Sequence, residues 1–361
     1  MSHASGMPSR ILVTGGAGFI GANLCLALKA AAPANEVIAL DSLKRRGSEL
    51  NLTRLREAGV RFVHGDVRER GDLLGLEPLG AIVECSAEPS VLAGMGAAAD
   101  FVVQTNLVGA HNCLELARRD GAQFVFLSTS RVYPVAGLSG LRLSERATRF
   151  ELKADQPCAG ASEHGIAEDF PLAGARTLYG ATKLAAELLI AEYADAFGVP
   201  AVIDRCGVIA GPWQMGKVDQ GVFAHWLLAH RLERPLTYLG YGGTGKQVRD
   251  LLHVDDLCEL VLEQLGDPAA WDGVTVNVGG GVEGSLSLRE TTDLCRELTG
   301  NEVAIEPVAE PRPGDVPLYV SDCRRLYART AWRPSRGPRR ILEDTLAWIE
   351  AHERAVTTAL G

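Results

Sequence analysis

The sequence predicts an α/β fold in which a doubly wound parallel sheet is joined by a smaller C-terminal α/β lobe. Short apolar runs alternate with helical patterns from residue 10 onwards, and the first run leads directly into a glycine-rich turn. The 361 residues also exceed what one simple core needs. We expect residues 10–205 with 246–280 to form the sheet domain, and residues 206–245 with 281–350 to form the smaller lobe.

Composition excludes several classes of protein. Hydrophobic residues make up 47% of the chain, which is enough for a substantial core. The net charge of −9 provides no general attraction to nucleic acid or to an anionic membrane. The eight cysteines form no CxxC pair and no cluster with histidine, so we expect reduced thiols and no bound metal. The start of the chain is polar, and no apolar run reaches ~18 residues. We therefore expect a cytoplasmic protein.

The first strand and its turn predict a dinucleotide site. Residues 10–14 read as a buried strand, the glycines of residues 15–21 follow, and a helical pattern comes next. The glycines fit GxGxxG from Gly16 and also GxxGxxG from Gly15. Such a turn is tight, brings bare backbone close to a pyrophosphate, and places the phosphates on the helix N-terminus. The sheet domain is therefore predicted to be of the Rossmann type.

A carboxylate supports NAD as the cofactor. The second apolar run, residues 36–40, ends at Asp41, twenty residues beyond Gly21. A carboxylate there binds the ribose hydroxyls of NAD. The basic residues Lys44, Arg45 and Arg46 follow and would suit a 2′-phosphate, but Asp41 would repel that group. We expect NAD rather than NADP, with the basic residues solvated.

Further side chains follow the later strands, and parallel sheets bind ligands beyond the carboxyl ends of their strands. Residues 60–64 and 81–85 are predicted strands, and residues 101–119 a long helix. Asp66 is either an acceptor for the adenine amino group or an ordinary turn aspartate. Thr129 follows the strand of residues 124–127, where its hydroxyl would reach a reacting oxygen. A cluster of threonine and serine at the end of a strand is, however, commonly just a turn.

The cofactor is expected to contact Gly15, Gly18, Phe19, Ile20, Gly21, Asp41, Asp66, Val67, Ser86, Ala87, Asn106, Tyr179 and Lys183.

Tyr179 and Lys183 are the candidate acid–base pair. They stand four residues apart at the start of a predicted helix, so they share one face. A free tyrosine has a pKa near ~10 and is a poor base at neutral pH. A cation within ~4–6 Å lowers such a pKa by roughly 1–3 units. Tyr179 would then accept a proton from a sugar hydroxyl while a hydride leaves the same carbon. An ordinary amphipathic helix is the alternative.

The long insertion 134–176 is weakly periodic and is expected to be a lid, with Glu163 and His164 as its titratable candidates; a solvated loop is the alternative. Beyond it we expect a strand over 200–205, a helix over 218–231, and short strands over 236–239 and 247–252. A helix should begin at Asp255 and Asp256 and run to residue 265. A strand over 274–278 and a helix over 286–299 complete the pattern, with Ser287 as a helix cap.

Taken together, these motifs resemble the extended short-chain dehydrogenase/reductases. The resemblance covers residues 11–348 and rests on residues 14–21, Asp41, Thr129, the Tyr179–Lys183 pair and the segment 249–256. Within that superfamily, residues 41–52 and 312–317 look most like CDP-paratose (tyvelose) 2-epimerases. The resemblance implies an NAD-dependent epimerase that inverts a sugar carbon of a nucleotide sugar through a transient ketone.

The resemblance also implies roles for single residues. Thr129, Tyr179 and Lys183 would be catalytic, and Arg249 and Arg312 would bind the diphosphate of the substrate, unless each forms a plain ion pair. Ser130 and Arg131 would touch the sugar. Members of the family commonly form a homodimer, and the resemblance implies one here through the helices of residues 101–119 and 179–197.

Two departures bear on the substrate. Relatives commonly carry His-x-Ala-Ala-Gln where residues 84–88 of this chain read Glu-Cys-Ser-Ala-Glu. Many relatives also carry an Asn two residues before the glycine of a later turn, and this Asn is missing before Gly211. Dehydratases of the superfamily carry an Asp-Glu pair after the threonine, and Ser130 and Arg131 stand there instead. Dehydration is therefore disfavoured. Simple dehydrogenation or reduction, uronic-acid decarboxylation with Arg131 holding the carboxylate, and a non-catalytic NAD-binding regulator remain as alternatives.

Overall fold

The computed structural model describes residues 6–90, 99–216 and 221–360, and the chain forms two compact units. The first unit comprises Met1–Thr129, Leu178–Arg205 and Leu257–Thr275, and the second comprises Ser130–Thr177, Cys206–Asp256 and Val276–Gly361. This division differs from the expected one, because residues 130–177, 246–256 and 276–280 lie in the second unit. Strand β13 (Val248–His253) explains part of the difference, since it pairs with other strands of the second unit.

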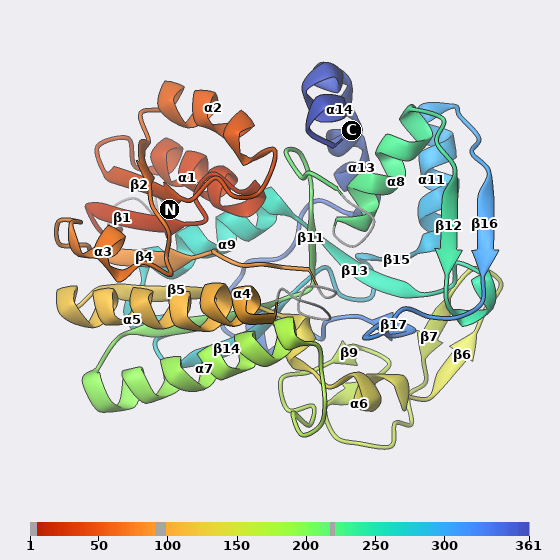
Figure 1. Ribbon diagram of the computed structural model, residues 1–361. Coiled ribbons are helices and arrows are strands. Elements are labelled where there is room, and N and C mark those ends of the chain that lie inside the picture. Colours follow the sequence, from red (N-terminus) through yellow and green to blue (C-terminus); the bar gives the residue numbers. More distant parts are fainter. Residues whose placement is uncertain (1–5, 91–98, 217–220, 361) are drawn as a thin grey trace. The chain divides into compact units, whose positions relative to one another are not determined.

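The first unit is built on a seven-stranded sheet of order β14-β10-β5-β4-β1-β2-β3, of which residues 276–278 of β14 are assigned to the second unit (Figure 1). A doubly wound parallel sheet was predicted, whereas the number and order of its strands were not. Its strands are β1 (Arg10–Thr14), β2 (Glu36–Asp41), β3 (Arg61–His64), β4 (Ala81–Glu84), β5 (Gln123–Thr129), β10 (Ala201–Cys206) and β14 (Val274–Val278). The pairs β1–β2, β1–β4, β2–β3 and β4–β5 are all parallel. The strand order reverses between β1 and β4, which is where open α/β sheets bind their ligands.

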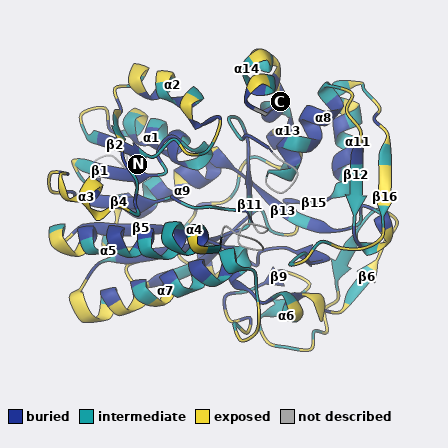
Figure 2. Cartoon of the chain, viewed as in Figure 1, coloured by how far each residue is buried: buried dark blue, intermediate teal, exposed yellow. Residues whose placement is uncertain are grey.

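Helices connect the strands of this unit. They are α1 (Phe19–Ala31), α2 (Asn51–Glu57), α3 (Arg70–Leu74), α4 (Ala99–Val103), α5 (Gly109–Asp120), α7 (Leu178–Phe197), α9 (Val254–Gly266) and α10 (Pro268–Trp271), with a 3-10 turn η2 (Ser48–Leu50). The main core joins strands β1, β2, β4, β5 and β10 to α5 and α7. In Figure 2 these strands are mostly dark blue, whereas α5 and α7 are yellow only towards their C-terminal ends.

The helix expected over residues 101–119 is interrupted by one π-helical turn, η3 (Gln104–Val108), between α4 and α5. Asn106 in this turn is 1% exposed. Its amide group bonds the backbone of Glu88 on one side and the Thr182 hydroxyl on the other. π-helical turns are rare and are frequent at functional sites. We attribute this turn to the two anchoring contacts of Asn106, which pattern analysis cannot detect.

The second unit contains several small sheets. Strands β11 (Val208–Ala210), β13, β15 (Ser285–Ser287) and β17 (Leu318–Tyr319) form one of them, and β12 (Leu236–Leu239) pairs in parallel with β16 (Ile305–Val308). Two antiparallel hairpins join β6 (Leu143–Glu145) to β7 (Phe150–Leu152) and β8 (Ala161–Ser162) to β9 (Gly165–Ile166). The helices and 3-10 turns are η4 (Ser130–Val132), α6 (Val135–Ser139), α8 (Val222–Arg231), η5 (Tyr241–Gly243), α11 (Leu288–Thr299), α12 (Arg324–Tyr327), α13 (Pro338–Ala351) and α14 (Glu353–Leu360).

The expected elements of this half are present, with two differences in detail. Ser287 caps α11 as predicted, in a capping box with Glu290. Helix α8 begins at Val222, and residues 218–220 of the predicted helix lie outside the described residues. The predicted strands over 236–239 and 247–252 exist, but they belong to different sheets, because each finds its partner elsewhere in the chain.

The insertion 134–176 is folded and packs within the second unit. The Phe150 amide donates to the Lys246 carbonyl at 3.0 Å, and Ile166 bridges to Ser321. Glu163 and His164, the predicted titratable pair, lie next to each other between β8 and β9, with side chains about half exposed. A lid function for this segment stays a prediction. In the described part of the chain, no helix has both the length and the apolarity to cross a membrane.

A buried carboxyl group gives the fold a testable dependence on pH. Asp204 in β10 is 0% exposed, and Gln264 of α9 donates to it at 2.9 Å. Burial raises the pKa of Asp204 to about 7. The folded protein therefore holds this proton more tightly than the unfolded chain, where the pKa is about 3.9. The contribution of this group to stability is lost as pH rises from about 4 to about 7.

We predict that Asp204→Asn, which stays neutral at every pH, has a higher melting temperature than the unsubstituted protein above pH 7, and that the difference shrinks towards pH 4. Thermal unfolding followed by circular dichroism across this range measures it. Asp293→Asn is the control, because the Asp293 side chain is 60% exposed. Equal pH profiles for the Asp204 variant and the unsubstituted protein would contradict the prediction.

Candidate active site

The glycine-rich turn has the shape that a pyrophosphate requires. Gly15 has a φ of +61°, and a Cβ on Gly16 would lie 2.6 Å from the Ala39 Cα. A Cβ on Gly21 would lie 2.2 Å from the Gly15 carbonyl oxygen. Helix α1 begins just after Gly18, which has no side chain to cap it, and its first turn carries no acidic residue. The N-terminus of α1 therefore suits an anionic ligand, and these residues fit the diphosphate of NAD.

Two side chains hold this turn in place. Asp41 at the end of β2 accepts from the Ala17 amide at 3.1 Å and from the Leu43 amide at 2.8 Å. Asn51, which is 2% exposed, donates its amide to the Ala17 carbonyl at 2.8 Å. Burial raises the pKa of Asp41, and these backbone amides oppose that rise. Contact of Asp41 with a ribose stays a prediction. Asn51 was missed as a site residue, although it lies in the segment 41–52 that carried the resemblance.

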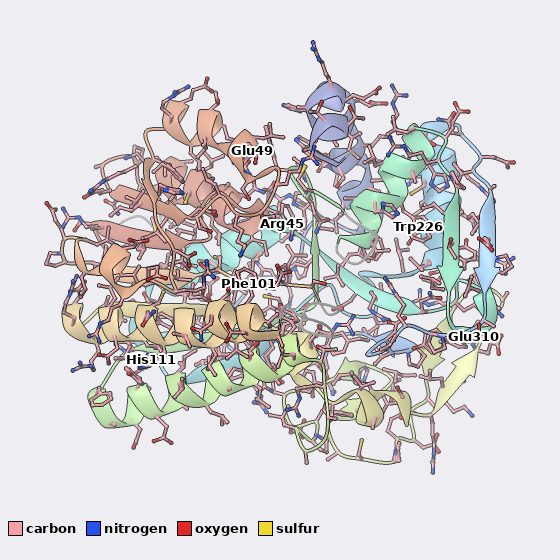
Figure 3. All side chains as sticks on the ribbon, viewed as in Figure 1. Arg45, Glu49, Phe101, His111, Trp226 and Glu310 are labelled. Carbon is pink, nitrogen blue, oxygen red and sulfur yellow. The ribbon has the colours of Figure 1, made fainter. Side chains whose placement is uncertain are left out.

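One of the basic residues after Asp41, Lys44, lies against an aromatic ring together with Arg68. The Lys44 ammonium lies 3.5 Å from the centre of the Phe101 ring, and the Arg68 guanidinium lies 5.0 Å from it. Figure 3 labels Phe101 on α4 and Arg45 in the loop after β2. Arg68 also forms an ion pair with Asp66 at 2.5 Å, which lowers the pKa of that carboxyl. Asp66 is thus engaged by an arginine, and its predicted contact with adenine stays untested.

Lys183 lies on α7, one turn after Tyr179, and its ammonium group is buried against a carboxylate and an aromatic ring. Its Nζ lies 3.4 Å from Oε2 of Glu84, and both side chains are at most 2% exposed. The same Nζ lies 4.3 Å from the centre of the Phe126 ring of β5. Burial raises the pKa of Glu84, and the charge of Lys183 opposes this rise. The contact of Glu84 with Lys183 was not expected from the sequence.

The end of β5 is fixed against α7 by a second buried pair. Arg205 of β10 binds the Glu187 carboxylate at 2.8 Å, and the Ser128 hydroxyl donates to the same carboxylate. Thr129, the next residue, is 7% exposed. Within the first unit, the predicted catalytic residues Thr129, Tyr179 and Lys183 therefore come from a strand and a helix that are held together.

Ser86 and Ala87 follow β4 and adjoin the glycine-rich turn. A Cβ on Gly15 would lie 3.2 Å from the Ser86 Cα, so the two segments are in close contact. Asn106 bonds the backbone of the same loop at Glu88, on both the amide and the carbonyl. Val67 accepts from Asn112 through its carbonyl at 2.9 Å. Asn106 thus positions a loop beside the cofactor turn in this structure, and its direct contact with the cofactor stays a prediction.

Three predicted substrate residues meet at one loop of the second unit, residues 312–316. Arg249 of β13 forms an ion pair with Asp315 at 2.7 Å and also donates to the Val316 carbonyl at 2.8 Å. Arg131, which follows Ser130 in η4, donates to the Gly314 carbonyl at 3.1 Å. Arg312 begins this loop, and its carbonyl accepts from the Asp315 amide. The predicted alternative of an ion pair for Arg249 is therefore realised, which leaves its phosphate binding as a proposal.

Tyr241 is a further residue of this cluster that sequence reasoning missed. It has a left-handed backbone, with φ of 52°, and its ring lies edge-on to Phe150 at 6.2 Å. Burial raises its pKa to about 12; the Asp315 carboxylate adds to the rise, and the charges of Arg249 and Arg131 oppose it. Backbone strain of this kind is frequent at functional sites. The only signal in the sequence is an aromatic residue inside the glycine-rich turn 240–245.

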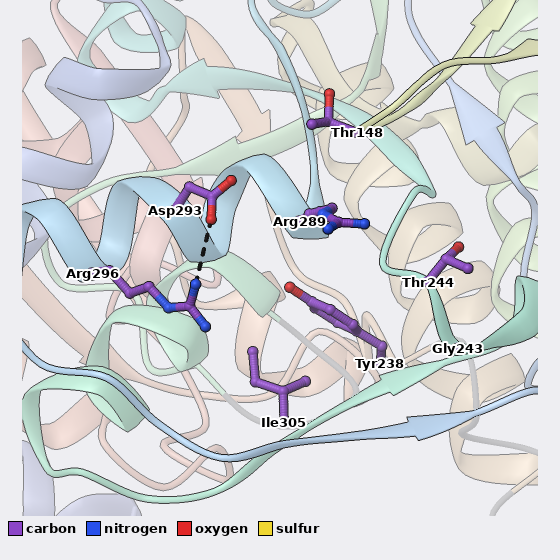
Figure 4. A pocket seen from close by; sticks show the side chains of 8 residues that line it. All are labelled: Thr148, Tyr238, Gly243, Thr244, Arg289, Asp293, Arg296 and Ile305. Atoms are coloured by element: carbon purple, nitrogen blue, oxygen red, sulfur yellow. Dashed lines mark ion pairs between the residues drawn. The ribbon is translucent and has the colours of Figure 1, made fainter.

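The second unit also contains a separate cavity of about 460 Å³, shown in Figure 4. Tyr238 of β12 and the α11 residues Arg289, Asp293 and Arg296 contribute to its lining. Arg296 and Asp293 form an ion pair across 3.6 Å. None of the predicted site residues lines this cavity. Among the residues that the structure describes, no group of three histidine, cysteine or acidic side chains could hold a metal ion.

Comparisons with known proteins show which family the chain resembles in sequence. The chain matches the NAD dependent epimerase/dehydratase family over residues 11–279. It is 29% identical to CDP-paratose 2-epimerase of Salmonella typhi over 95% of this chain and 99% of that protein. It is 30% identical to a dTDP-glucose 4,6-dehydratase of Mycobacterium tuberculosis over 95% of this chain and 94% of that protein.

A solved structure shows the same fold with the cofactor. UDP-glucose 4-epimerase of Thermus thermophilus, in complex with NAD, is 27% identical to the chain and has a TM-score of 0.74. The similarity covers 94% of this chain and 99% of that structure. With the glycine cradle described above, this supports NAD as the cofactor of this protein. The chain therefore belongs to the NAD dependent epimerase/dehydratase family.

Proposed function

We propose that the protein is an NAD-dependent epimerase that inverts one sugar carbon of a nucleoside-diphosphate sugar, in the manner of a CDP-paratose 2-epimerase. The similarity to the Salmonella typhi enzyme extends over nearly the full length of both chains. The site supports the proposal through the buried side chain of Lys183, one helical turn after Tyr179 on α7. A regulator that only binds NAD would have no need of this pair.

The chain's own residues would carry the proton chemistry. Tyr179 accepts the proton of a sugar hydroxyl, and the Lys183 ammonium stabilises the phenolate that this requires. The Thr129 hydroxyl donates a hydrogen bond to the reacting oxygen. Bound NAD supplies a hydride acceptor that later returns the same hydride. The resulting keto-sugar rotates in the pocket, so that the hydride returns to the opposite face of the same carbon. Tyr179 then returns the proton to the sugar oxygen. The reaction consumes no external reductant.

Dehydration is the second candidate, because the chain is similar to proteins named dTDP-glucose 4,6-dehydratase. One observation supports epimerisation instead. Removal of water needs a general acid and a general base close to the sugar. The residues after Thr129 are Ser130 and Arg131, which are poor in both roles. Arg131 in addition donates to the Gly314 carbonyl, so its side chain is committed to the loop 312–316. This commitment favours epimerisation.

The diphosphate of the substrate would bind to arginines of the second unit. The net charge of −9 opposes anions, so binding depends on local cations. Arg249 and Arg312 are the candidates, because a guanidinium fork matches two phosphate oxygens. Asp315 would yield its contact with Arg249 to the phosphate, or share the guanidinium with it.

Assembly is a separate proposal. Leu188 and Phe197 on α7 are 64% and 56% exposed. Two large apolar side chains on one exposed helix support a homodimer through α5 and α7, which sedimentation analysis would measure.

The function is tested with a panel of CDP-, UDP- and GDP-sugars followed by NMR. We predict an isomer of unchanged mass from at least one of them. Tyr179→Phe should show no turnover but should retain NAD, because the other predicted cofactor contacts are unchanged. Ser139→Ala on α6 is a control outside the site. A product lighter by one water would instead indicate a dehydratase. An active Tyr179→Phe would place the base elsewhere.

Arg312→Ala should weaken binding of the converted nucleotide sugar by at least tenfold and leave NAD affinity unchanged, because it removes a charged contact with the diphosphate. Isothermal titration calorimetry measures both affinities. Arg312→Lys tests the need for a fork and should recover only part of the loss. Arg329→Ala, on the same unit but outside the loop 312–316, is the control. Unchanged substrate affinity in Arg312→Ala would exclude the assignment.

A further inference from the structure

Glu84 is a buried carboxylate to which the proposed mechanism gives no part. It ends strand β4, is 1% exposed, and places Oε2 3.4 Å from the Lys183 Nζ. The Thr14 hydroxyl of β1 lies 3.5 Å from its other oxygen. An isolated buried carboxylate is costly, so its position against the ammonium of Lys183 needs a reason.

Other groups around Lys183 do not compete for its charge. The thiols of Cys85 and Cys113 are close enough to Lys183 for its charge to affect them. Burial raises the pKa of both thiols well above the ordinary value, and the Glu84 carboxylate adds to this rise. Both thiols therefore stay neutral. The Phe126 ring, 4.3 Å from Nζ, also favours a cation.

The usual helical partner of Lys183 is committed elsewhere. Glu187 stands four residues further along α7, which is the spacing of helical ion pairs. Its carboxylate, however, binds Arg205 at 2.8 Å and accepts from the Ser128 hydroxyl. Among the described residues, Glu84 is the acidic group that forms an ion pair with Lys183.

We propose that Glu84 is a positioning residue, which keeps the Lys183 ammonium charged and in place beside Tyr179. This inference rests on the proposed function. At 3.4 Å the contact is longer than a charge-assisted hydrogen bond of ~2.7–2.9 Å, so it compensates the charge without taking up all its donors. An ammonium has three donors, so this single contact does not use them all.

The consequence of removing Glu84 follows from burial. A buried ammonium without a carboxylate partner is strongly disfavoured relative to its neutral amine. In Glu84→Gln the ammonium of Lys183 would lose the counter-charge that holds it, and Tyr179 would lose the cation that favours its phenolate. The phenol of Tyr179 should then ionise at higher pH.

The experiment measures the phenolate of Tyr179 directly, without substrate. Protein loaded with NAD is titrated with base, and the ultraviolet absorbance of phenolate is recorded for each background with and without Tyr179→Phe. The difference isolates Tyr179 from the other six of the seven tyrosines. We expect the midpoint to rise by about 1–3 pH units in Glu84→Gln. Glu84→Asp, which keeps the charge, should restore most of the shift.

A double-variant comparison shows whether Glu84 acts through Lys183. Lys183→Met should raise the midpoint in the original background and leave it unchanged in the Glu84→Gln background. Equal shifts in both backgrounds, or a midpoint that falls or stays constant in Glu84→Gln, would overturn the proposal. Glu168→Gln is the control: it removes a buried carboxylate of the second unit and should leave the midpoint unchanged.

Failure of this inference is distinct from failure of the proposed function. If Lys183→Met leaves the midpoint unchanged in the original background, the acid–base pair itself is wrong. If Lys183→Met shifts it and Glu84→Gln does not, only the role of Glu84 is wrong. Should Glu84→Gln fail to fold, as judged by circular dichroism, Glu84→Asp alone carries the test, since its shorter side chain should still produce a small upward shift.

Discussion

The ion pair between Lys183 and Glu84 is the interaction on which the rest of the active-site description depends. A helix, α7, presents the ammonium, and strands β4 and β5 supply the carboxylate and the Phe126 ring that surround it. Both charges are almost completely buried, so neither would be tolerated without the other. The sheet order explains how they meet, because β4 and β5 are neighbours next to the switch point at β1.

A second set of buried polar contacts keeps this arrangement rigid. Glu187 ties α7 to Arg205 and Ser128, and Asn106 ties α7 to the loop after β4. Asp41 and Asn51 hold the Ala17 peptide of the glycine-rich turn from its two sides. Satisfied buried networks of this kind define one conformation better than apolar packing alone does. The first unit is thus preorganised around its cofactor turn.

Local patterns were sufficient to predict most of the fold. The strand ending in Thr14, the glycines after it, Asp41 and the helix of Tyr179 all have signals within a few neighbouring residues. The π-helical turn at Asn106, the role of Asn51 and the partner of Lys183 were not predictable in this way. Each depends on a contact between residues far apart in sequence, such as the pairing of residue 84 with residue 183. The same reason accounts for the domain division, because the partners of β13 decide its unit.

The central claim is that a hydride leaves the sugar, stays on the bound cofactor and returns to the same carbon. A nucleotide sugar carrying deuterium at the inverted carbon tests it most directly, with the product analysed by mass spectrometry after reaction in ordinary water. The account predicts that the isolated isomer keeps its deuterium and that no free NADH appears. Loss of the label to solvent would contradict the account, because it would show that the carbon is inverted by removal and addition of a proton.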